Sequence, residues 1–158
     1  LAAGNNGQNI DIHAEFPNDT PDGENEIADN VLMVGATTYE YDESLPAAFS
    51  NYGKRNVDVF APGYGIYSTV PGNRYHVMDG TSMAAPAVSG VAALLRSYFP
   101  KLTAAQVKQI IMKSGTKIDF KVLTPGGEPT LVSFTDLCVY GRILNAYNAV
   151  VMAGKMIK

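Results

Sequence analysis

The stretch Asp79-Gly80-Thr81-Ser82-Met83-Ala84-Ala85-Pro86 combines a glycine turn, two hydroxyl side chains and a run of small residues. Apolar residues continue to Leu95 and Phe99-Pro100 ends the run, which predicts a helix over residues 82–98. Ser82 then lies at the positive end of the helix dipole, beside backbone N–H groups that have no intrahelical partner. Such donors can stabilise an oxyanion. By itself, however, the local pattern favours Ser82 or Thr81 as a simple helix cap.

The composition describes one globular domain. The chain has 158 residues, of which 46% are hydrophobic and 17% charged, and this is enough to bury a sizeable core. A net charge of −3 argues against a nucleic-acid partner. No apolar run approaches the roughly 20 residues that a membrane span needs. The single cysteine, Cys138, excludes an internal disulfide, and its apolar neighbours predict a packed thiol on a strand.

Short apolar runs before the Ser82 stretch predict strands of a sheet. Residues 31–36 and 57–63 are continuous apolar segments, typical of strands buried on both faces. Residues 1–4 have the pattern of the end of another buried strand. Residues 66–70 and 74–78 flank a Pro-Gly-Asn turn, which predicts a β-hairpin that leads directly to Ser82.

The last third of the chain predicts two more helices. Thr103-Ala104-Ala105-Gln106 has the form of a capping box, and the helix that it begins is expected to end at Gly115. Residues 116–129 are expected to form a loop with a Pro-Gly-Gly turn. Residues 131–140 predict a strand, and apolar residues from Ile143 to Val151 predict a final helix.

The segment Gly80-Thr81-Ser82-Met83-Ala84-Ala85-Pro86 closely resembles the nucleophile motif of subtilisin-like serine peptidases. Four further segments match that family in the same order: Val-Gly-Ala at residues 34–36, Phe-Ser-Asn-Tyr-Gly at 49–53, Val-Phe-Ala-Pro-Gly at 59–63 and Ser-Thr-Val-Pro-Gly-Asn at 68–73. The resemblance implies an α/β fold: a partial subtilisin-like fold in which residues 1–158 form the C-terminal half of a parallel sheet flanked by helices, plus a β-hairpin.

The resemblance also implies a set of site residues. Ser82 is expected to be the nucleophile and a backbone oxyanion donor, and the Asn5 side chain the second donor of the oxyanion hole. Ala2, Ala3 and Gly4 are expected to form one wall of the pocket for the residue before the scissile bond. The implied parent is a serine endopeptidase that hydrolyses protein or peptide substrates through an acyl-enzyme on Ser82, with no cofactor or metal in the chemistry.

Neither histidine lies in a motif like the family's base motif, and the chain starts after the region where the family carries its triad Asp and His. His13 and His76 are interpreted as surface or packing residues, so the isolated chain is expected to be inactive. The alternative is a non-catalytic peptide-binding or interaction module with a subtilisin-like fold. An α/β-hydrolase is set aside, because Gly80-Thr81-Ser82-Met83-Ala84 lacks the second glycine of the Gly-x-Ser-x-Gly elbow.

The remaining expectations concern ions, assembly and location. Carboxylates cluster in the loop of residues 10–30, and their spacing favours a solvated acidic loop over a structural calcium site, which stays the weaker alternative: Asp19, Asp22, Glu24, Glu26 and Asp29. A sheet cut in half exposes an edge strand and apolar faces, so self-association is expected. Family resemblance implies a secreted or cell-envelope location.

Overall fold

The computed structural model describes residues 1–20 and 26–156. Its main sheet has four strands in the order β1-β2-β8-β5. β1 (Val34–Thr37), β2 (Val59–Pro62) and β8 (Arg142–Ile143) run parallel, whereas β5 (Thr116–Lys117) pairs with β8 in the antiparallel direction. Ala2 forms a parallel bridge with Val34 and places the start of the chain beside β1. The predicted α/β fold with a parallel sheet is confirmed.

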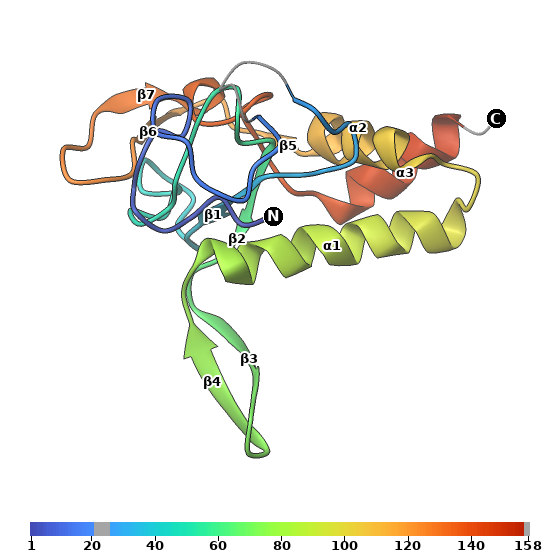
Figure 1. The fold of residues 1–158 in the computed structure, drawn as a ribbon, viewed down its shortest axis with the longest axis horizontal. Coiled ribbons are helices and arrows are strands. Elements are labelled where there is room, and N and C mark those ends of the chain that lie inside the picture. The colour runs from blue at the N-terminus through green and yellow to red at the C-terminus, as the bar shows by residue number, and fades with distance from the viewer. Residues whose placement is uncertain (21–25, 157–158) are drawn as a thin grey trace.

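Three helices cover one face of the sheet. They are α1 (Thr81–Tyr98), α2 (Ala104–Ser114) and α3 (Ala146–Met156), and they lie together on one side of the molecule (Figure 1). The predicted capping box is present: the Thr103 hydroxyl accepts from the Gln106 N–H, and the Gln106 side chain accepts from the Thr103 N–H. Gly115 ends α2, as the sequence predicts.

Alternating side chains of β1 and β2 divide the core between the two faces of the sheet. Val34 and Ala61 point to the helix side and pack with Val88 and Leu95 of α1. The opposite face is covered by loops and a small hairpin, β6 (Lys121–Leu123) with β7 (Leu131–Ser133). On that face the Phe60 ring lies 5.2 Å from the ring of a buried partner, Phe134, in an edge-on arrangement. β1 and β2 are therefore buried on both faces, as their continuous apolar runs predict.

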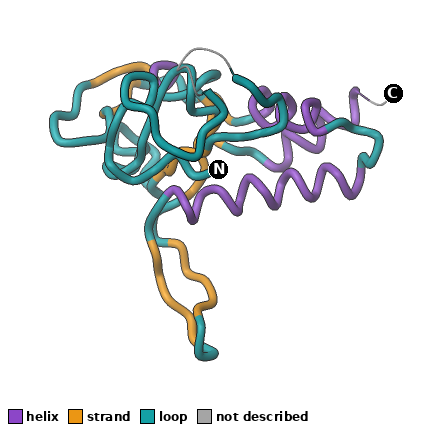
Figure 2. Tube along the Cα trace, viewed as in Figure 1, coloured by secondary structure: helices purple, strands orange, loops and turns teal. Residues whose placement is uncertain are grey.

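The predicted β-hairpin is present at the predicted residues. β3 (Ile66–Val70) and β4 (Arg74–Met78) form a two-stranded ribbon that extends away from the body of the molecule (Figures 1 and 2). Most of its side chains are exposed, including a stacked pair of tyrosines, Tyr67 and Tyr75, whose ring centroids are 5.3 Å apart. None of the described helices is long and apolar enough to cross a membrane.

The strand predicted over residues 131–140 is wrong beyond Ser133. β7 ends there, and the Ser133 side chain accepts from the Thr135 N–H and starts a short 3₁₀ turn, η1 (Phe134–Asp136). Phe134 in this turn and Cys138 just after it are both buried in the core on the face of the sheet opposite the helices, which explains the apolar pattern without a strand. Cys138 is packed as expected, but in a turn, and burial raises the pKa of its thiol to about 12.

Candidate functional site

The chain turns sharply just before α1. Gly80 occupies the N-cap position of α1 with φ 149° and ψ 157°. Because glycine has no side chain, this residue itself cannot cap the N–H groups of the first turn. The Gly80 N–H donates to the Gly63 carbonyl at 2.8 Å, and a Cβ on Gly63 would lie 2.7 Å from the Gly80 carbonyl oxygen. Both glycines therefore permit a close approach between β2 and the start of α1 that a larger residue would block.

Asn5, which lies 76 residues before Thr81 in the sequence, caps the start of α1. Its side-chain Oδ1 accepts from the Thr81 N–H and from the Thr81 hydroxyl, both at 2.9 Å. Since Oδ1 must face these two donors, the amide nitrogen Nδ2 faces away from Thr81, and it lies 3.3 Å from the position of a Cβ on Gly80. Asn5 is thus a capping residue rather than an ordinary turn asparagine. We call Gly4, Asn5 and Thr81 the Asn5–Thr81 cluster.

Ser82 lies exposed in the first turn of α1, directly after Thr81. The Thr81 N–H is taken by Asn5, and the Met83 N–H donates to the Gly80 carbonyl at 2.9 Å. Among the described residues the Ser82 N–H has no hydrogen-bond partner. A hydroxyl, a free backbone donor and a side-chain amide thus lie at one helix N-terminus, where an oxyanion would be stabilised.

Ala2, Ala3 and Gly4 run along the edge of β1. The Ala3 N–H donates to the Val34 carbonyl at 3.0 Å, and the Gly4 N–H donates to the Thr81 hydroxyl at 3.1 Å. Gly4 has φ +104°, and a Cβ there would lie 2.4 Å from Nδ2 of Asn51. The predicted pocket wall is therefore tied both to the sheet and to the residue before Ser82.

Asn51 is a supporting residue that the sequence did not single out. Its side chain is fully buried; Oδ1 accepts from the N–H groups of Asn6 and Gln8, both at 3.0 Å, and Nδ2 donates to the Ala3 carbonyl at 2.9 Å. The Asn51 N–H also donates to the Gly4 carbonyl at 2.9 Å. These bonds hold the loop that carries Asn5. Only its place in the matched segment 49–53 could have marked it.

The two histidines are not brought to Ser82. His13 is exposed in the loop after Asn5, and its N–H donates to the Asn9 carbonyl. His76 is exposed on β4 opposite Ser68, in the hairpin that runs away from the helix (Figure 1). Their placement agrees with the interpretation as surface residues.

The acidic loop is not wholly solvated, and this corrects one expectation. Asp19 is only 6% exposed, and its carboxylate lies 3.8 Å from the Lys108 ammonium on α2. Glu26 and Asp58 lie 2.7 and 3.4 Å from the same nitrogen. A buried cation attracts these acids, which local spacing cannot reveal. Asp22 and Glu24 lie outside the described residues. We call Lys108, Asp19, Glu26 and Asp58 the Lys108 cluster.

Burial governs the ionisation of the Lys108 cluster. It raises the pKa of Asp58 to about 6, even though Lys108 and a hydrogen bond from the Met33 N–H favour the carboxylate. It also raises the pKa of Asp19, against the attraction of Lys108. For Lys108 burial acts to lower the pKa, but the hydrogen bond to Glu26 and the nearby negative charges raise it above its ordinary value.

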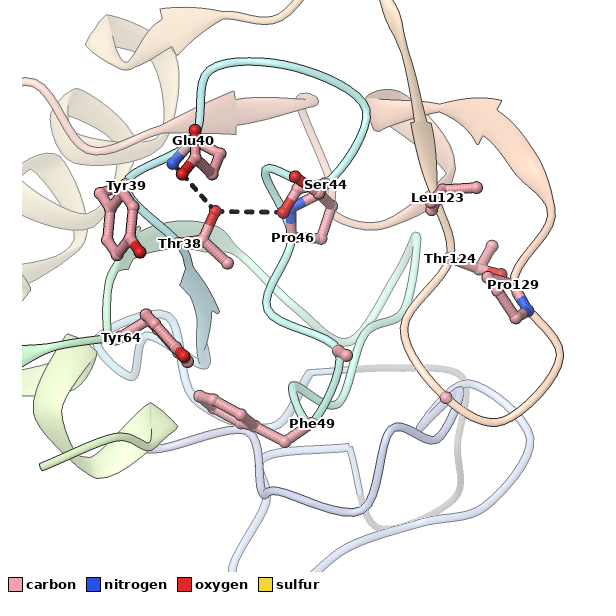
Figure 3. Close-up of a pocket in the computed structure, with 12 residues that line it drawn as sticks. Thr38, Tyr39, Glu40, Ser44, Pro46, Phe49, Tyr64, Leu123, Thr124 and Pro129 are labelled. Carbon is pink, nitrogen blue, oxygen red and sulfur yellow. Dashed lines mark hydrogen bonds between the residues drawn. The ribbon is translucent and has the colours of Figure 1, made fainter.

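An apolar cavity of about 390 Å³ lies beside the loop that carries Asn5. Figure 3 shows aromatic side chains of Tyr39, Phe49 and Tyr64 on one side of it and Leu123 and Pro129 on the other. The Gly7 N–H donates to the Phe49 carbonyl at 2.8 Å, which joins the cavity to the loop. Its lining includes none of the predicted site residues.

Comparisons with known proteins identify the family of the chain. The model of the subtilase family matches residues 1–135. A thermophilic serine proteinase of Bacillus sp. (strain AK1) is 42% identical over 149 residues, which cover 94% of this chain and 29% of that protein. Subtilisin DY of Bacillus licheniformis is 41% identical over 90 residues, which cover 57% of this chain and 31% of that protein.

Two solved structures align with nearly the whole of this chain. A protease from Pseudoalteromonas arctica aligns over 96% of this chain and 41% of its own, with 28% identity and a TM-score of 0.64. A chain of the subtilase cytotoxin SubAB aligns over 98% of this chain and 48% of its own, with 25% identity and a TM-score of 0.67. The chain thus spans less than a third of these curated relatives and less than half of these solved chains. Because the family model covers most of the sequence, the chain belongs to the subtilase family.

Proposed function

We propose that this chain supplies the nucleophile half of a serine endopeptidase active site. Ser82 attacks the scissile carbonyl of a peptide, and the Ser82 N–H and the Asn5 Nδ2 donate to the resulting oxyanion. The general base takes the Ser82 proton and gives it to the leaving amine as the scissile C–N bond breaks, which leaves an acyl ester on Ser82. Water, activated by the same base, then hydrolyses this ester, releases the carboxylic acid and restores the Ser82 hydroxyl. No metal or organic cofactor is required in these steps.

The observation that carries this proposal is the pair of hydrogen bonds that Thr81 donates to Asn5 Oδ1, both at 2.9 Å. They orient a side chain 76 residues away so that its remaining donor lies at the same helix end as Ser82. An asparagine needed only to cap a helix would be expected close to that helix in sequence. Loss of either hydrogen bond from Thr81 should disturb the orientation of Asn5, and should therefore lower the rate of acylation more than the affinity for substrate.

In this proposal, the general base and the carboxylate that orients it lie in the part of the domain to which residues 1–158 do not align. The chain aligns with 41% and 48% of the two solved chains, which leaves room for both groups. Ser82 alone is expected to be inert, because a serine hydroxyl needs a base to become a nucleophile.

A chimera tests the proposal. This chain would replace the aligned 149-residue segment of the Bacillus AK1 proteinase, to which it is 42% identical, so that the relative provides the remaining half. We expect a fluorophosphonate probe to label the chimera rapidly and the isolated chain negligibly. Labelling should disappear in Ser82→Ala and persist in Ser89→Ala, which removes another exposed serine of α1.

Two outcomes would contradict the proposal. A chimera that melts cooperatively but neither takes the label nor cleaves casein would favour the alternative, a peptide-binding module without catalysis. Rapid labelling of Ser82 in the isolated chain, lost in His76→Ala, would show that the base is His76 and that the chain needs no second half.

We propose further that the isolated chain self-associates. From Thr81 to Leu95, α1 has no charged residue, yet Ala87, Gly90 and Leu94 are exposed. Apolar helix surface of this kind is normally covered in a folded protein. Light scattering at micromolar concentration should report a mass above the monomer value of 16.9 kDa. A monomer would contradict the expectation.

We propose that the parent protein is exported from the cell. The support is the resemblance itself; one relative, 37% identical over 120 residues, is named a cell wall-associated protease of Bacillus subtilis. Fractionation of the source cells with an antibody against this chain would test it, and a purely cytoplasmic signal would count against it.

A further inference from the structure

Glu15 brings a carboxylate to the wall formed by Ala2–Gly4. Its Oε1 accepts from Asn6 Nδ2 at 2.6 Å and lies 3.4 Å from Asn51 Nδ2. Its Cδ is 3.7 Å from the position that a Cβ on Gly4 would occupy. The carboxylate therefore lies at ordinary contact distance from the wall, and the side-chain amides of Asn6 and Asn51 hold it there.

Two residues, Gly4 and Thr81, link Glu15 to the proposed nucleophile Ser82. The Gly4 N–H donates to the Thr81 hydroxyl at 3.1 Å, and Ser82 follows Thr81. The Glu15 carboxylate lies 3.7 Å from the position of a Cβ on Gly4 and accepts a hydrogen bond from Asn6, the residue after Asn5. Glu15 and Thr81, the residue before Ser82, therefore both lie beside the same glycine of the wall.

The charge of Glu15 is not balanced within the described residues. Four acids there are buried or half-buried: Asp11, Glu15, Asp19 and Asp58. Asp11 pairs with Arg55, and Asp19 and Asp58 share Lys108. Within residues 1–20 and 26–156, Glu15 is the one acid of the four with no cation within 4.0 Å. A partly desolvated carboxylate without a counter-ion favours a cationic ligand.

The hydrogen bonds of Glu15 do not require its charge. The bond from Asn6 Nδ2 needs only an acceptor oxygen, which a glutamine would supply equally well. No described side chain donates to Oε2. A structural role in the loop thus accounts for one oxygen and leaves the negative charge and the second oxygen unexplained.

We propose that Glu15 selects peptide substrates that carry a lysine or arginine immediately before the scissile bond. This inference rests on the proposed peptidase function and on Ala2–Gly4 as the pocket wall. The cationic end of the substrate side chain donates to the free oxygen of Glu15, while the aliphatic part lies along the backbone of the wall. Glu15 is a specificity residue that touches the substrate but not the reacting atoms.

The first test compares substrates in the chimera with the Bacillus AK1 proteinase. Peptides that differ only in the residue before the cleaved bond, Arg, Lys or Met, would be assayed for kcat/KM. We expect Glu15→Gln to reduce the Arg-to-Met and Lys-to-Met preferences at least about tenfold, because a charge-assisted bond becomes a neutral one. Glu15→Gln keeps the acceptor for Asn6, so the loop should fold normally.

Glu128→Gln is the matched control, since it removes the same charge from an exposed position in the loop between β6 and β7. Its preferences should equal those of the unsubstituted chimera. If Glu15→Gln leaves the preferences unchanged while hydrolysis proceeds, the specificity proposal is wrong and the peptidase proposal stands.

The second test does not depend on catalysis. The 158-residue chain would be titrated with butylguanidinium and with butylurea, its neutral counterpart, while the side-chain NH₂ signals of Asn6 are followed by NMR. A response to the cation alone, lost in Glu15→Gln and kept in Glu128→Gln, supports the proposal even if the chimera is inactive. Equal responses to both probes, or none to the cation, would overturn it.

Discussion

The Asn5–Thr81 cluster and the Lys108 cluster both join distant parts of the chain, through hydrogen bonds that span 76 and 82 residues. The first uses neutral groups only, an amide, a hydroxyl and backbone N–H groups. The second places one ammonium 2.7–3.8 Å from three carboxylates, and Lys108 is only 3% exposed. One cluster leaves donors free at the surface, whereas the other buries the charges of Lys108, Asp19 and Asp58.

The difference has a physical consequence. Neutral groups can leave one donor unpaired at low cost when that donor faces solvent, so the Asn5–Thr81 cluster can serve a ligand without loss of the fold. Buried charges have no such freedom, because removal of either sign leaves the other uncompensated. We therefore expect substitutions in the Lys108 cluster to affect stability most and those in the Asn5–Thr81 cluster to affect ligand chemistry more.

The largest expected effect is that of Lys108→Met. Loss of the ammonium leaves Asp58 and Asp19 buried without a cation, and we expect unfolding free energy to fall by about 3–5 kcal/mol in urea denaturation. Lys101→Met, at an exposed position, should change it by less than about 0.5 kcal/mol. A Lys108→Met chain as stable as the unsubstituted one would show that the cluster does not stabilise the fold.

The pH dependence of the Lys108 cluster should run opposite to that of a carboxylate whose pKa is lowered on folding. The pKa of Asp58 is raised to about 6, above the 3.8 of the unfolded chain, so the folded state binds more protons between these values. The contribution of Asp58 to stability is therefore largest below pH 4 and declines, by up to about 3 kcal/mol, as pH rises to 6.

Urea denaturation of the unsubstituted chain and of Asp58→Asn at pH 4, 5, 6 and 7 measures this contribution. The stability of the unsubstituted chain relative to Asp58→Asn should decrease from pH 4 to 6 and then level off. A difference that increases over this range would mean that Lys108 stabilises the carboxylate more than burial destabilises it.

In the Asn5–Thr81 cluster we expect a smaller loss. Thr81→Val keeps the shape of the side chain but removes the acceptor of the Gly4 N–H and one donor to Asn5, which should cost about 1–3 kcal/mol. Thr81→Ser retains the hydroxyl and should cost less. In the chimera, Thr81→Val should also lower kcat more than it raises KM, because Asn5 loses its orientation. Identical behaviour of the two variants would exclude a role for the hydroxyl.

The smallest expected effect is that of calcium. Asp19 and Glu26 already lie beside Lys108, so the weaker alternative of a calcium site in the acidic loop has fewer free carboxylates than the sequence suggests. Addition of calcium or EDTA should shift the Tm of the isolated chain by no more than about 1 °C. A larger shift, abolished by substitution of Asp29 or Glu24, would restore the calcium hypothesis.

Local sequence patterns predicted strands β1 and β2, the hairpin and the three helices, but wrongly assigned β5 and β6 to a loop. The hairpin of β3 and β4, the capping box at Thr103 and the helix from Thr81 follow from turn residues, caps and apolar periodicity, all of which act within a few residues. Apolar pattern alone failed at residues 131–140, where a 3₁₀ turn buries the same side chains as a strand would. The two-residue strand β8 is too short to show any period.

Some residues of the candidate site could be predicted from the sequence, whereas others became evident only in the structure. Motifs in the sequence, by their resemblance to subtilisin-like peptidases, single out Ser82, Asn5 and the wall residues Ala2–Gly4 as candidates. They include Asn51 in the matched segment 49–53 but do not mark it as a site residue, because the sequence does not show that its amide is buried and makes several hydrogen bonds. They gave no sign of Glu15, since its importance comes from a neighbour in space, Gly4, rather than from its own segment.

The sequence by itself determined where the helices and the hairpin form and which family motif the chain carries, because those features depend on neighbouring residues. Only the tertiary structure decided which polar groups meet. Thr81 reaches Asn5, Lys108 reaches Glu26, and Glu15 reaches the wall beside Gly4 through packing of the sheet and α1. Hydrogen bonds and ion pairs act over a few ångströms in space, and the fold alone sets which residues lie that close.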